Sequence, residues 1–226
     1  MKIVKRLIAI IFLAALVTGG YIFYQGYQDY QDALSRMSVE EMGRQIKENP
    51  HYTTLEELPE TYLKAVLAVE DKRFYKHFGV DVIATARAIF NDIRAMAPVE
   101  GGSTITQQLA KNQYFTQDKN LYRKAAEFFM AFKIEDTFDK NTILELYLNS
   151  IFFGNNYYCV ADASMGYFGK APAQMNEDEC TLLAGIPNAP SAYNPLVNPE
   201  LARQRQQQVI RKMEKCGDIE IGTGSR

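Results

Sequence analysis

Residues 59–77 read PETYLKAVLAVEDKRFYKH, and apolar side chains recur along this stretch at helical spacing. The residues that lie three or four positions apart, and so share one helix face, are Leu63, Val66, Leu67, Glu70 and Phe74. Glu70 therefore interrupts an otherwise apolar stripe. The pattern predicts a helix from Pro59 to about His77 with one carboxylate on its buried side.

Helix-start signals recur in the rest of the chain. The runs Thr54–Glu57 and Asn176–Glu179 both have the spacing of a capping box. Asn198 and Pro199 open a final helix that we expect to reach about Lys215. The alternation of apolar and polar residues that is typical of strands is weak throughout. The sequence predicts a mainly α-helical domain.

The first residues have the pattern of a membrane anchor. Leu7 to Phe23 contains no charged residue, and its roughly 17 residues would span ~26 Å as a helix, near the lower limit for crossing a bilayer. Basic residues precede this run and acidic residues follow it, which places the start inside and the remainder outside. A cleaved signal peptide begins in the same way, but the run continues into Tyr21–Tyr24 rather than a small-x-small cleavage site.

The chain of 226 residues suits one globular domain with appendages. We expect four segments: residues 1–24 as the cytoplasmic start and a single transmembrane helix, 25–53 as a polar stalk, 54–215 as the helical domain, and 216–226 as a flexible tail.

Charge and cysteine content argue against nucleic-acid binding and against a disulfide framework or a cysteine metal site. The net charge of −2 gives no overall attraction to nucleic acid, so we expect no nucleic-acid partner. The three cysteines, Cys159, Cys180 and Cys216, are widely spaced and match neither a disulfide framework nor a metal-ligand pattern. We expect buried free thiols.

Burial of Glu70 on an apolar face disfavours its charged form, which suits a general base. The alternative is a structural role in a buried ion pair or hydrogen-bond network, because such carboxylates also interrupt apolar stripes. Asp71 lies about 100° further round the helix, so it should support Glu70 rather than duplicate it. His77 is expected to be a packing or capping residue.

Residues 100–112, EGGSTITQQLAKN, place two glycines and two hydroxyls before a helix. Free backbone N–H groups and the helix dipole favour an anion at such a point. Ser103, Thr104 and the amides of Gln107 and Gln108 suit a sugar or a phosphate. The stretch lacks the Gly-Lys-Ser/Thr ending of a P-loop.

A second carboxylate lies beside cations further along the chain. Arg123 and Glu127 are four residues apart on a helix that becomes apolar nearly all round, with Lys111 and Lys119 shortly upstream. An ordinary intrahelical pair would explain Arg123 and Glu127. A cationic cluster would also suit a pyrophosphate leaving group, whose charge needs neutralisation.

These three stretches, Glu70–Gly79, Gly101–Asn112 and Arg123–Glu127, resemble the signature motifs of glycosyltransferase family 51, the peptidoglycan glycosyltransferases. Later stretches at 143–149, 167–170 and 183–191 match further motifs in the same order, and the resemblance covers about residues 55–213. The chain looks like the monofunctional type. The resemblance implies a lysozyme-like helical domain that polymerises lipid II, held by one transmembrane helix in the bacterial inner membrane with its N-terminus inside and its catalytic domain outside.

The resemblance also implies roles for individual residues. Glu70 would take the proton from the acceptor 4-hydroxyl, which displaces undecaprenyl pyrophosphate with inversion. Glu127 would stabilise the leaving-group side, together with a divalent cation, Mg²⁺ or Mn²⁺, bound through the pyrophosphate. The implied substrate-binding residues are Asp71, Ser103, Thr104, Gln107, Lys111, Lys119, Arg123 and Lys124. Expected partners are lipid II, the growing glycan, membrane lipid and other cell-wall synthesis proteins; no organic cofactor is expected.

The chain departs from the family pattern in places. Lys119 stands where the family usually has Arg, which keeps the charge but loses bidentate phosphate geometry. Residues 156–162 lack the usual Gly- and Glu-containing form, which bears on local packing. Residues 80–96 predict an amphipathic helix with Val82, Ile83, Ala86, Ile89, Phe90 and Ile93 on its apolar face. This helix either dips toward the membrane, as in the family, or packs in the core.

Two other functions remain. A membrane-anchored, lysozyme-like glycan hydrolase would share the fold and the acidic pair but has no need of a cationic cluster. A non-catalytic membrane scaffold has no reason to carry carboxylates on apolar faces.

Overall fold

The computed structural model describes residues 2–96, 101–116 and 120–217, and within these ranges it contains helices, an isolated β-bridge between Phe78 and Val80, and no strand. The α-helices are α1 (Lys2–Arg36), α2 (Val39–Lys47), α3 (Glu60–Glu70), α4 (Val82–Ala95), α5 (Ile105–Tyr114), α6 (Leu121–Thr137), α7 (Lys140–Leu148), α8 (Val160–Phe168), α9 (Glu177–Gly185) and α10 (Pro199–Cys216). Short 3-10 turns lie at Leu55–Glu57, Phe74–Lys76, Pro172–Gln174 and Ile186–Asn188. The predicted mainly α class is confirmed.

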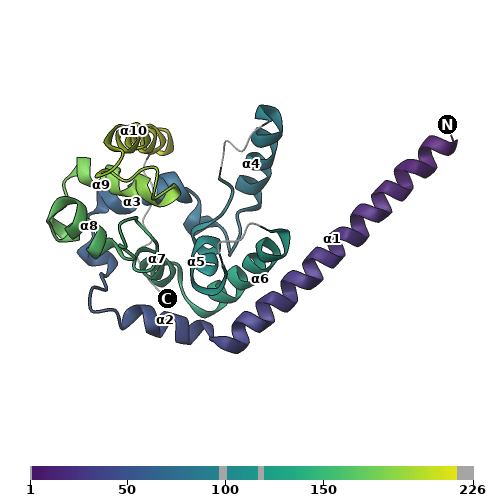
Figure 1. Ribbon diagram of the computed structural model, residues 1–226, viewed down its shortest axis with the longest axis horizontal. Helices are drawn as coiled ribbons and strands as arrows, with labels where there is room; N and C mark the ends of the chain where they lie inside the picture. Colours follow the sequence, from purple (N-terminus) through teal and green to yellow (C-terminus); the bar gives the residue numbers. More distant parts are fainter. Residues whose placement is uncertain (1, 97–100, 117–119, 218–226) are drawn as a thin grey trace.

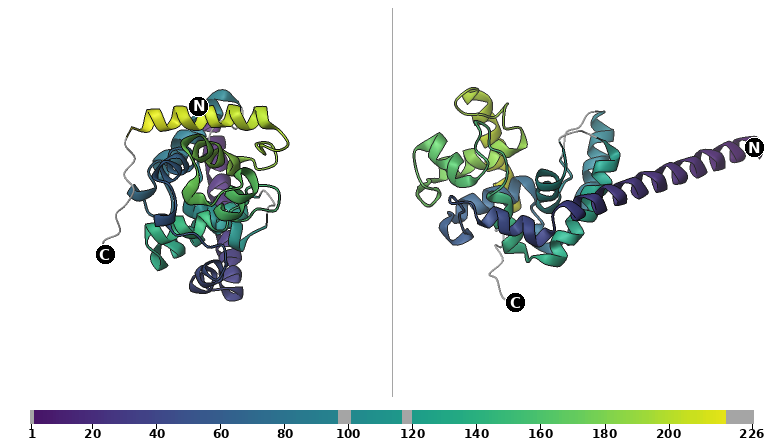
Figure 2. Two further views of the ribbon diagram at one scale, coloured as in Figure 1. Left: turned by 90° about the vertical axis from the view of Figure 1, so that its left-hand side faces the viewer. Right: turned by 60° about the horizontal axis from the view of Figure 1, so that its bottom comes forward.

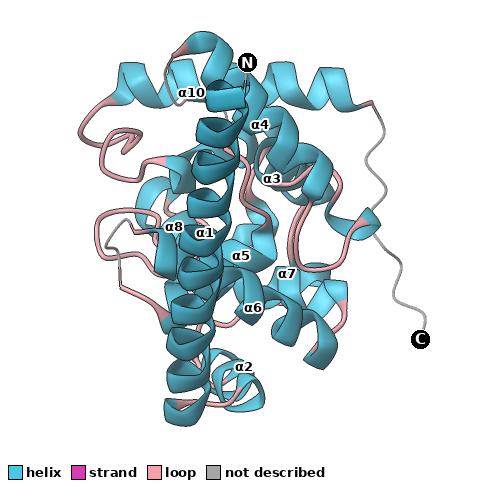
Figure 3. Cartoon of the chain, turned by 90° about the vertical axis from the view of Figure 1, so that its right-hand side faces the viewer, coloured by secondary structure: helices cyan, strands magenta, loops and turns pink. Residues whose placement is uncertain are grey.

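The core lies between α3, α5, α7 and α9. Helix α3 packs against α9 and α10, and α5 packs against α6 and α7. Figure 2 shows α10 lying across one end of the domain, and Figure 3 shows helices joined by loops. The largest fully buried side chains include Tyr62, Phe74, Tyr147 and Phe153. The domain therefore holds the end of α3, which carries Glu70, in a rigid helical frame.

Helix α1 leaves the domain as a single straight rod (Figure 1). Its first half is exposed and apolar, and within the described residues it is the one helix whose length and composition suit a membrane span. The predicted apolar anchor is therefore a helix, but it continues without a break to Arg36.

Residues 25–53 differ from the stalk that we expected. Gly26 and Ala33 in the second half of α1 are buried. A Cβ added at Gly26 would lie 2.4 Å from the Cβ of Ala125, so α1 touches the backbone of α6. Helix α2 then contributes Met42 and its neighbours Val39 and Ile46 to the core. The segment is bound to the domain because small and apolar side chains lie on the faces that meet α6 and α7.

Helix α3 ends at Glu70, seven residues before the end that the apolar spacing predicts. Asp71 leaves the helical conformation with φ −157° because its carboxylate is bonded elsewhere, to His77 and to the N–H of Ile105. Phe74 stays fully buried although it lies in a separate 3-10 turn. The chain then turns back at Gly79, whose φ of +67° favours glycine.

Several sequence predictions are confirmed locally. Both expected capping boxes, Thr54 with Glu57 and Asn176 with Glu179, are present. The final helix begins at Pro199 and ends at Cys216. Cys159 and Cys180 are buried free thiols, whereas the free Cys216 is half-buried. The predicted tail beyond residue 217 lies outside the described residues.

The exposure of helix α4 decides between the two alternatives for residues 80–96, contact with the membrane and packing in the core. Val82, Ile83, Phe90 and Ile93 are 63–72% exposed, so most of its apolar face packs against nothing in the domain. Core packing therefore does not explain this face. An exposed apolar surface of this kind marks a contact with lipid or with a partner.

Candidate active site

A cleft of about 650 Å³ opens between the end of α3, the start of α5, the start of α6 and helix α10. It brings together eight of the residues that the sequence singled out: Glu70, Ser103, Gln107, Gln108, Lys111, Arg123, Lys124 and Glu127. They come from stretches that are far apart in sequence. The cleft is therefore the candidate active site.

Glu70 lies at the last residue of α3, with its side chain only 8% exposed. One carboxylate oxygen, Oε2, accepts a hydrogen bond of 2.8 Å from the amide of Gln108. The other, Oε1, is buried without a hydrogen-bond partner and lies 4.0 Å from the Arg205 guanidinium. Glu70 thus lies in the cleft with one oxygen hydrogen-bonded and the other without a hydrogen-bond donor, as a proton acceptor requires.

Glu127 lies among cations in the same cleft. Its carboxylate, 2% exposed, is 3.1 Å from Nε of Arg123 and 2.9 Å from Nζ of Lys124. The Lys124 ammonium also donates to Oγ of Ser103 at 2.7 Å. The predicted pair between Arg123 and Glu127 is therefore present, and Lys124 joins it.

Burial lowers the pKa of Lys111, and the neighbouring Arg123 and Lys124 lower it further, whereas Glu127 and Glu70 oppose the shift. The cations around Glu127 are therefore crowded and only partly neutralised by carboxylates. An anion that enters the cleft would relieve this repulsion. The cluster favours a ligand with more than one negative charge.

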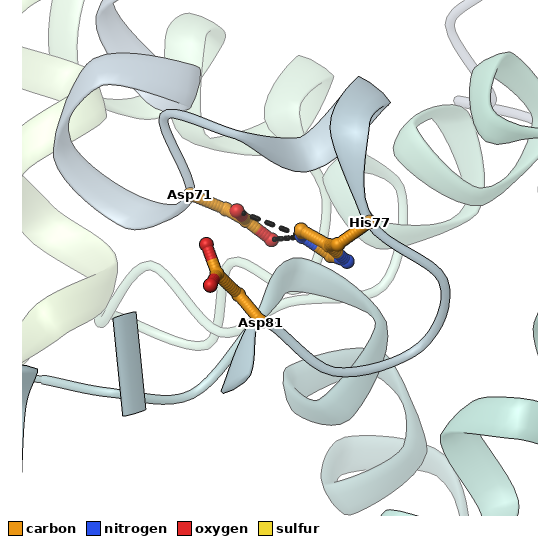
Figure 4. A group of neighbouring side chains, drawn as sticks. All are labelled: Asp71, His77 and Asp81. Atoms are coloured by element: carbon orange, nitrogen blue, oxygen red, sulfur yellow. Dashed lines mark hydrogen bonds and ion pairs between the residues drawn. The ribbon is translucent and has the colours of Figure 1, made fainter. Parts of the chain in front are cut away.

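Asp71 faces the interior and supports the site (Figure 4). Its oxygens bond Nε2 of His77 at 2.9 and 3.0 Å, and Oδ2 accepts the N–H of Ile105 at 3.1 Å. Asp71 thereby joins the end of α3 to the start of α5. It lines a smaller neighbouring cavity rather than the cleft itself, so a direct contact with substrate stays a prediction.

Asp81 completes this network from the start of α4. It forms a two-point ion pair with Arg73 and caps α4 by accepting the N–H of Ala84. The Arg73 guanidinium lowers the pKa of Asp81 to about 2. The expected packing role of His77 agrees with its nearly complete burial against Asp71.

Thr104 and Gln107 form a capping box at the start of α5, which the sequence reading overlooked although its spacing is visible there. The Thr104 hydroxyl donates to the carbonyl of Gly79 at 2.6 Å. Thr104 thus holds the loop in place, whereas Gln107 also lines the cleft. Lys119, predicted to bind substrate, lies outside the described residues.

Other residues of the cleft carried no sequence signal. Arg205, Gln208 and Lys212 of α10 line it opposite α6, together with Asn188. In the sequence, these polar residues cannot be distinguished from those of a solvent-exposed helix face. They lie near Glu70 because α10 packs on α3.

The residues present do not form a resident site for a divalent cation at Glu127. Its neighbours are Arg123, Lys124 and Lys111, and cations repel a metal ion. Within the described ranges, the one group of acidic and His side chains close enough to share a metal is Asp71, His77 and Asp81, whose carboxylates already bind His77, Arg73 and backbone N–H groups.

Residues 36–214 match the family model described as Transglycosylase. The chain belongs to the transglycosylase family. This transglycosylase is thus a glycosyltransferase enzyme, and the family and lysozyme-like class predicted from the motifs are confirmed.

The curated relatives of this transglycosylase include penicillin-binding proteins 1A. The chain is 46% identical to that of Aquifex aeolicus (strain VF5) over 168 residues, which cover 74% of this chain and 23% of the relative. It is 47% identical to that of Neisseria cinerea over 162 residues, 72% of this chain and 20% of the relative. The chain thus spans about a fifth of the length of the curated relatives it matches.

Proposed function

We propose that this transglycosylase polymerises lipid II into β-1,4-linked glycan strands and releases undecaprenyl pyrophosphate. The observation that carries the proposal is the pairing, in one cleft, of a buried carboxylate with a free oxygen and a cluster of three cations. A glycosyl transfer from a pyrophosphate donor needs these two parts: a base for the attacking hydroxyl and neutralisation of the leaving group.

In the proposed reaction, Oε1 of Glu70 accepts the proton of the acceptor 4-hydroxyl. The hydroxyl oxygen forms a bond to the anomeric carbon of the donor while the bond from that carbon to the pyrophosphate oxygen breaks. Attack opposite the leaving group inverts the configuration. Gln108 holds the other oxygen of Glu70 and so restricts rotation of the carboxylate.

On the leaving-group side, Lys111, Arg123 and Lys124 bind the departing pyrophosphate, and Glu127 holds Arg123 and Lys124 in position. Ser103 is bonded to Lys124 and can share in binding the same group. Where a divalent cation takes part, we propose that it arrives bound to the pyrophosphate, since Glu127 alone offers it no ligand set.

We infer that α1 crosses the inner membrane with Lys2, Lys5 and Arg6 inside and the domain outside, since basic residues precede the span. The exposed apolar face of α4 would then contact the same bilayer. The inferred partners are lipid II, the growing glycan and membrane lipid, with other cell-wall synthesis proteins as further candidates.

A lytic hydrolase is the competing function, and one assay separates the two. The full chain in detergent is incubated with labelled lipid II, and separately with preformed glycan strands. We expect polymer that lysozyme digests, and no cleavage of the strands. Cleavage of the strands without polymer formation would establish the hydrolase.

The substitution Glu70→Gln tests the proposed base. The amide keeps the size of the side chain and its bond to Gln108 but cannot accept the proton. We expect polymerisation to fall by at least ~10²–10⁴-fold with an unchanged melting temperature. Near-parental turnover would exclude Glu70 as the base.

A further inference from the structure

Two aromatic side chains lie together on the loop between α7 and α8. The ring centroids of Phe152 and Tyr158 are 4.9 Å apart, and the ring planes are inclined by 37°. Tyr158 is 58% exposed, and Phe152 is half-buried. We call these two side chains the aromatic pair. An exposed ring that is supported by a second ring offers a flat apolar surface to a ligand.

The loop holds the aromatic pair in a fixed arrangement. The N–H of Phe153 donates to the carbonyl of Tyr157 at 2.8 Å, and the N–H of Tyr157 donates to the carbonyl of Gly154 at 2.9 Å. A closed turn therefore separates the two rings in the sequence. Gly154, Asn155 and Asn156 all have positive φ, of 87°, 49° and 59°. Such a backbone is strained for residues that carry a side chain, and strain of this kind is concentrated at functional sites.

The same loop packs against a segment that lines the cleft. The side-chain amide of Asn194 donates to the side-chain oxygen of Asn155 at 2.9 Å. A Cβ added at Gly154 would lie 3.1 Å from the carbonyl oxygen of Pro190. Residues 187 and 188, shortly before Pro190, line the cleft itself. The segment from 187 to 194 thus contacts both the cleft and the loop that carries the aromatic pair.

The inference rests on the proposed function, in which a growing strand stays joined to pyrophosphate at one end. The cations of α5 and α6 bind that end, and α1 and α4 contact the bilayer. Helix α8, which follows the aromatic pair in the chain, lies at the end of the domain opposite the N-terminal half of α1 (Figure 1). The sugars of a long strand therefore extend away from the bilayer, toward the end of the domain that carries the aromatic pair.

The aromatic pair suits such a strand chemically. A pyranose ring has apolar C–H groups on its faces and hydroxyls around its edge. The C–H groups carry a small positive charge, which is attracted to the negative face of an aromatic ring. The Tyr158 hydroxyl can also donate to or accept from a sugar hydroxyl.

We propose that the aromatic pair is a second binding site for the glycan strand, where Tyr158 stacks on a sugar that has already left the cleft. A strand that is held both there and in the cleft dissociates more slowly than one held in the cleft alone, because each contact raises the effective concentration of the other. The aromatic pair thereby favours long products.

The chain contains no tryptophan, which allows a direct test. Tyr158→Trp keeps an aromatic face and places a single tryptophan at the aromatic pair. The full chain in detergent is titrated with lipid-free strands of alternating N-acetylglucosamine and N-acetylmuramic acid, and separately with the corresponding disaccharide. We expect a saturable change in tryptophan fluorescence with strands of about twelve sugars, and none with the disaccharide at the same concentration.

Phe78→Trp is the matched control. Phe78 is 52% exposed, and its ring lies 5.9 Å from that of Phe132 with the planes inclined by 38°. It thus belongs to an exposed pair of similar geometry, which packs on α6 instead of lying beside α8. The fluorescence of Phe78→Trp should respond to neither ligand.

Two further variants measure the contribution of the ring to affinity by calorimetry. Tyr158→Leu keeps an apolar side chain but removes the flat face, whereas Tyr158→Phe keeps the face and removes the hydroxyl. Loss of one stacking contact weakens binding about two- to tenfold. We expect Tyr158→Leu to raise the Kd for the long strand by this factor and to leave that for the disaccharide unchanged. Tyr158→Phe should stay close to the parent with both ligands.

Three results would overturn the proposal: no fluorescence response of Tyr158→Trp to the long strand, an equal response of Phe78→Trp, or a parental Kd for the long strand in Tyr158→Leu. The last result would show that the flat ring is not needed for strand binding. Failure of the proposed function would appear differently, as absence of polymer from lipid II with the parental protein. The titrations use preformed strands, so they report on the aromatic pair without any turnover.

Discussion

The contact between α1 and α6 can be tested with one methyl group. In Gly26→Ala, the new Cβ would lie 2.4 Å from the Cβ of Ala125, 2.8 Å from the carbonyl oxygen of Tyr122 and 2.9 Å from the nitrogen of Ala126. Two of these three atoms belong to the backbone of α6 and cannot rotate away. The two helices must therefore separate, and overpacking of this kind costs about 1–3 kcal/mol.

The better helix propensity of alanine offsets part of this cost, by about 1 kcal/mol. Gly20→Ala serves as the control, because its Cβ meets nothing within 4 Å and it gains the propensity alone. We expect Gly26→Ala to melt below Gly20→Ala by about 2–12 °C in detergent, at ~2–4 °C per kcal/mol for a domain of this size.

The assay is thermal unfolding followed by circular dichroism, with turnover measured in parallel. Because α6 carries Arg123 and Glu127, separation of α1 from α6 should also lower polymerisation. Equal melting temperatures for Gly26→Ala and Gly20→Ala would show that α1 does not pack closely on α6, and would refute the docked arrangement.

Three further outcomes are expected. Burial lowers the pKa of Lys111, so this side chain loses its charge at a lower pH than an ordinary lysine. The kcat/KM for the donor should therefore decline as the pH rises into the alkaline range, and Lys111→Arg should move that decline to higher pH. Asp81 has a pKa of about 2 in the folded protein against 3.8 ordinarily, so its charge stabilises the fold above pH 3.8 and this contribution is lost as the pH falls toward 2. Asp81→Asn should therefore cost about 2 kcal/mol of unfolding free energy at pH 7. The difference in melting temperature between the parent and this variant should shrink below pH 3.8. Deletion of residues 1–24 removes Gly19, Ile22 and Phe23, which line an apolar cavity together with α4 and α6, so turnover on long-chain lipid II should fall in detergent as well as in liposomes. A loss confined to liposomes would show that α1 acts only as a membrane anchor.

Local patterns predicted most of the fold. The apolar spacing around Leu63 and Glu70 and the boxes at Thr54 and Asn176 each depend on residues a few positions apart, and each is present. The end of α3 could not be predicted in this way, because Asp71 leaves the helix to bond Ile105, which is brought near only by the tertiary fold.

The docked position of residues 25–53 has the same cause. In the sequence, Gly26 lies in a polar segment and gives no sign of packing. Its lack of a side chain matters only because α6 lies against it in the fold. In the site, the motifs singled out Glu70, Glu127, Lys111, Arg123 and Lys124, and all five line one cleft. They gave no indication of Arg205, since its role depends on α10 packing on α3.

Because α1 is one unbroken helix from the membrane segment into the domain, the thickness of the bilayer should affect the rate of catalysis. Its uncharged stretch, Leu7 to Phe23, extends for ~26 Å, against ~30 Å for the hydrocarbon layer, and the last turns of the same helix are fixed to α6. A thin bilayer is accommodated when such a helix tilts, and here the domain must tilt with it. The height of Glu70 above the lipid would then follow the thickness of the membrane, so lipids of different length should tune the rate of this transglycosylase without touching its active site.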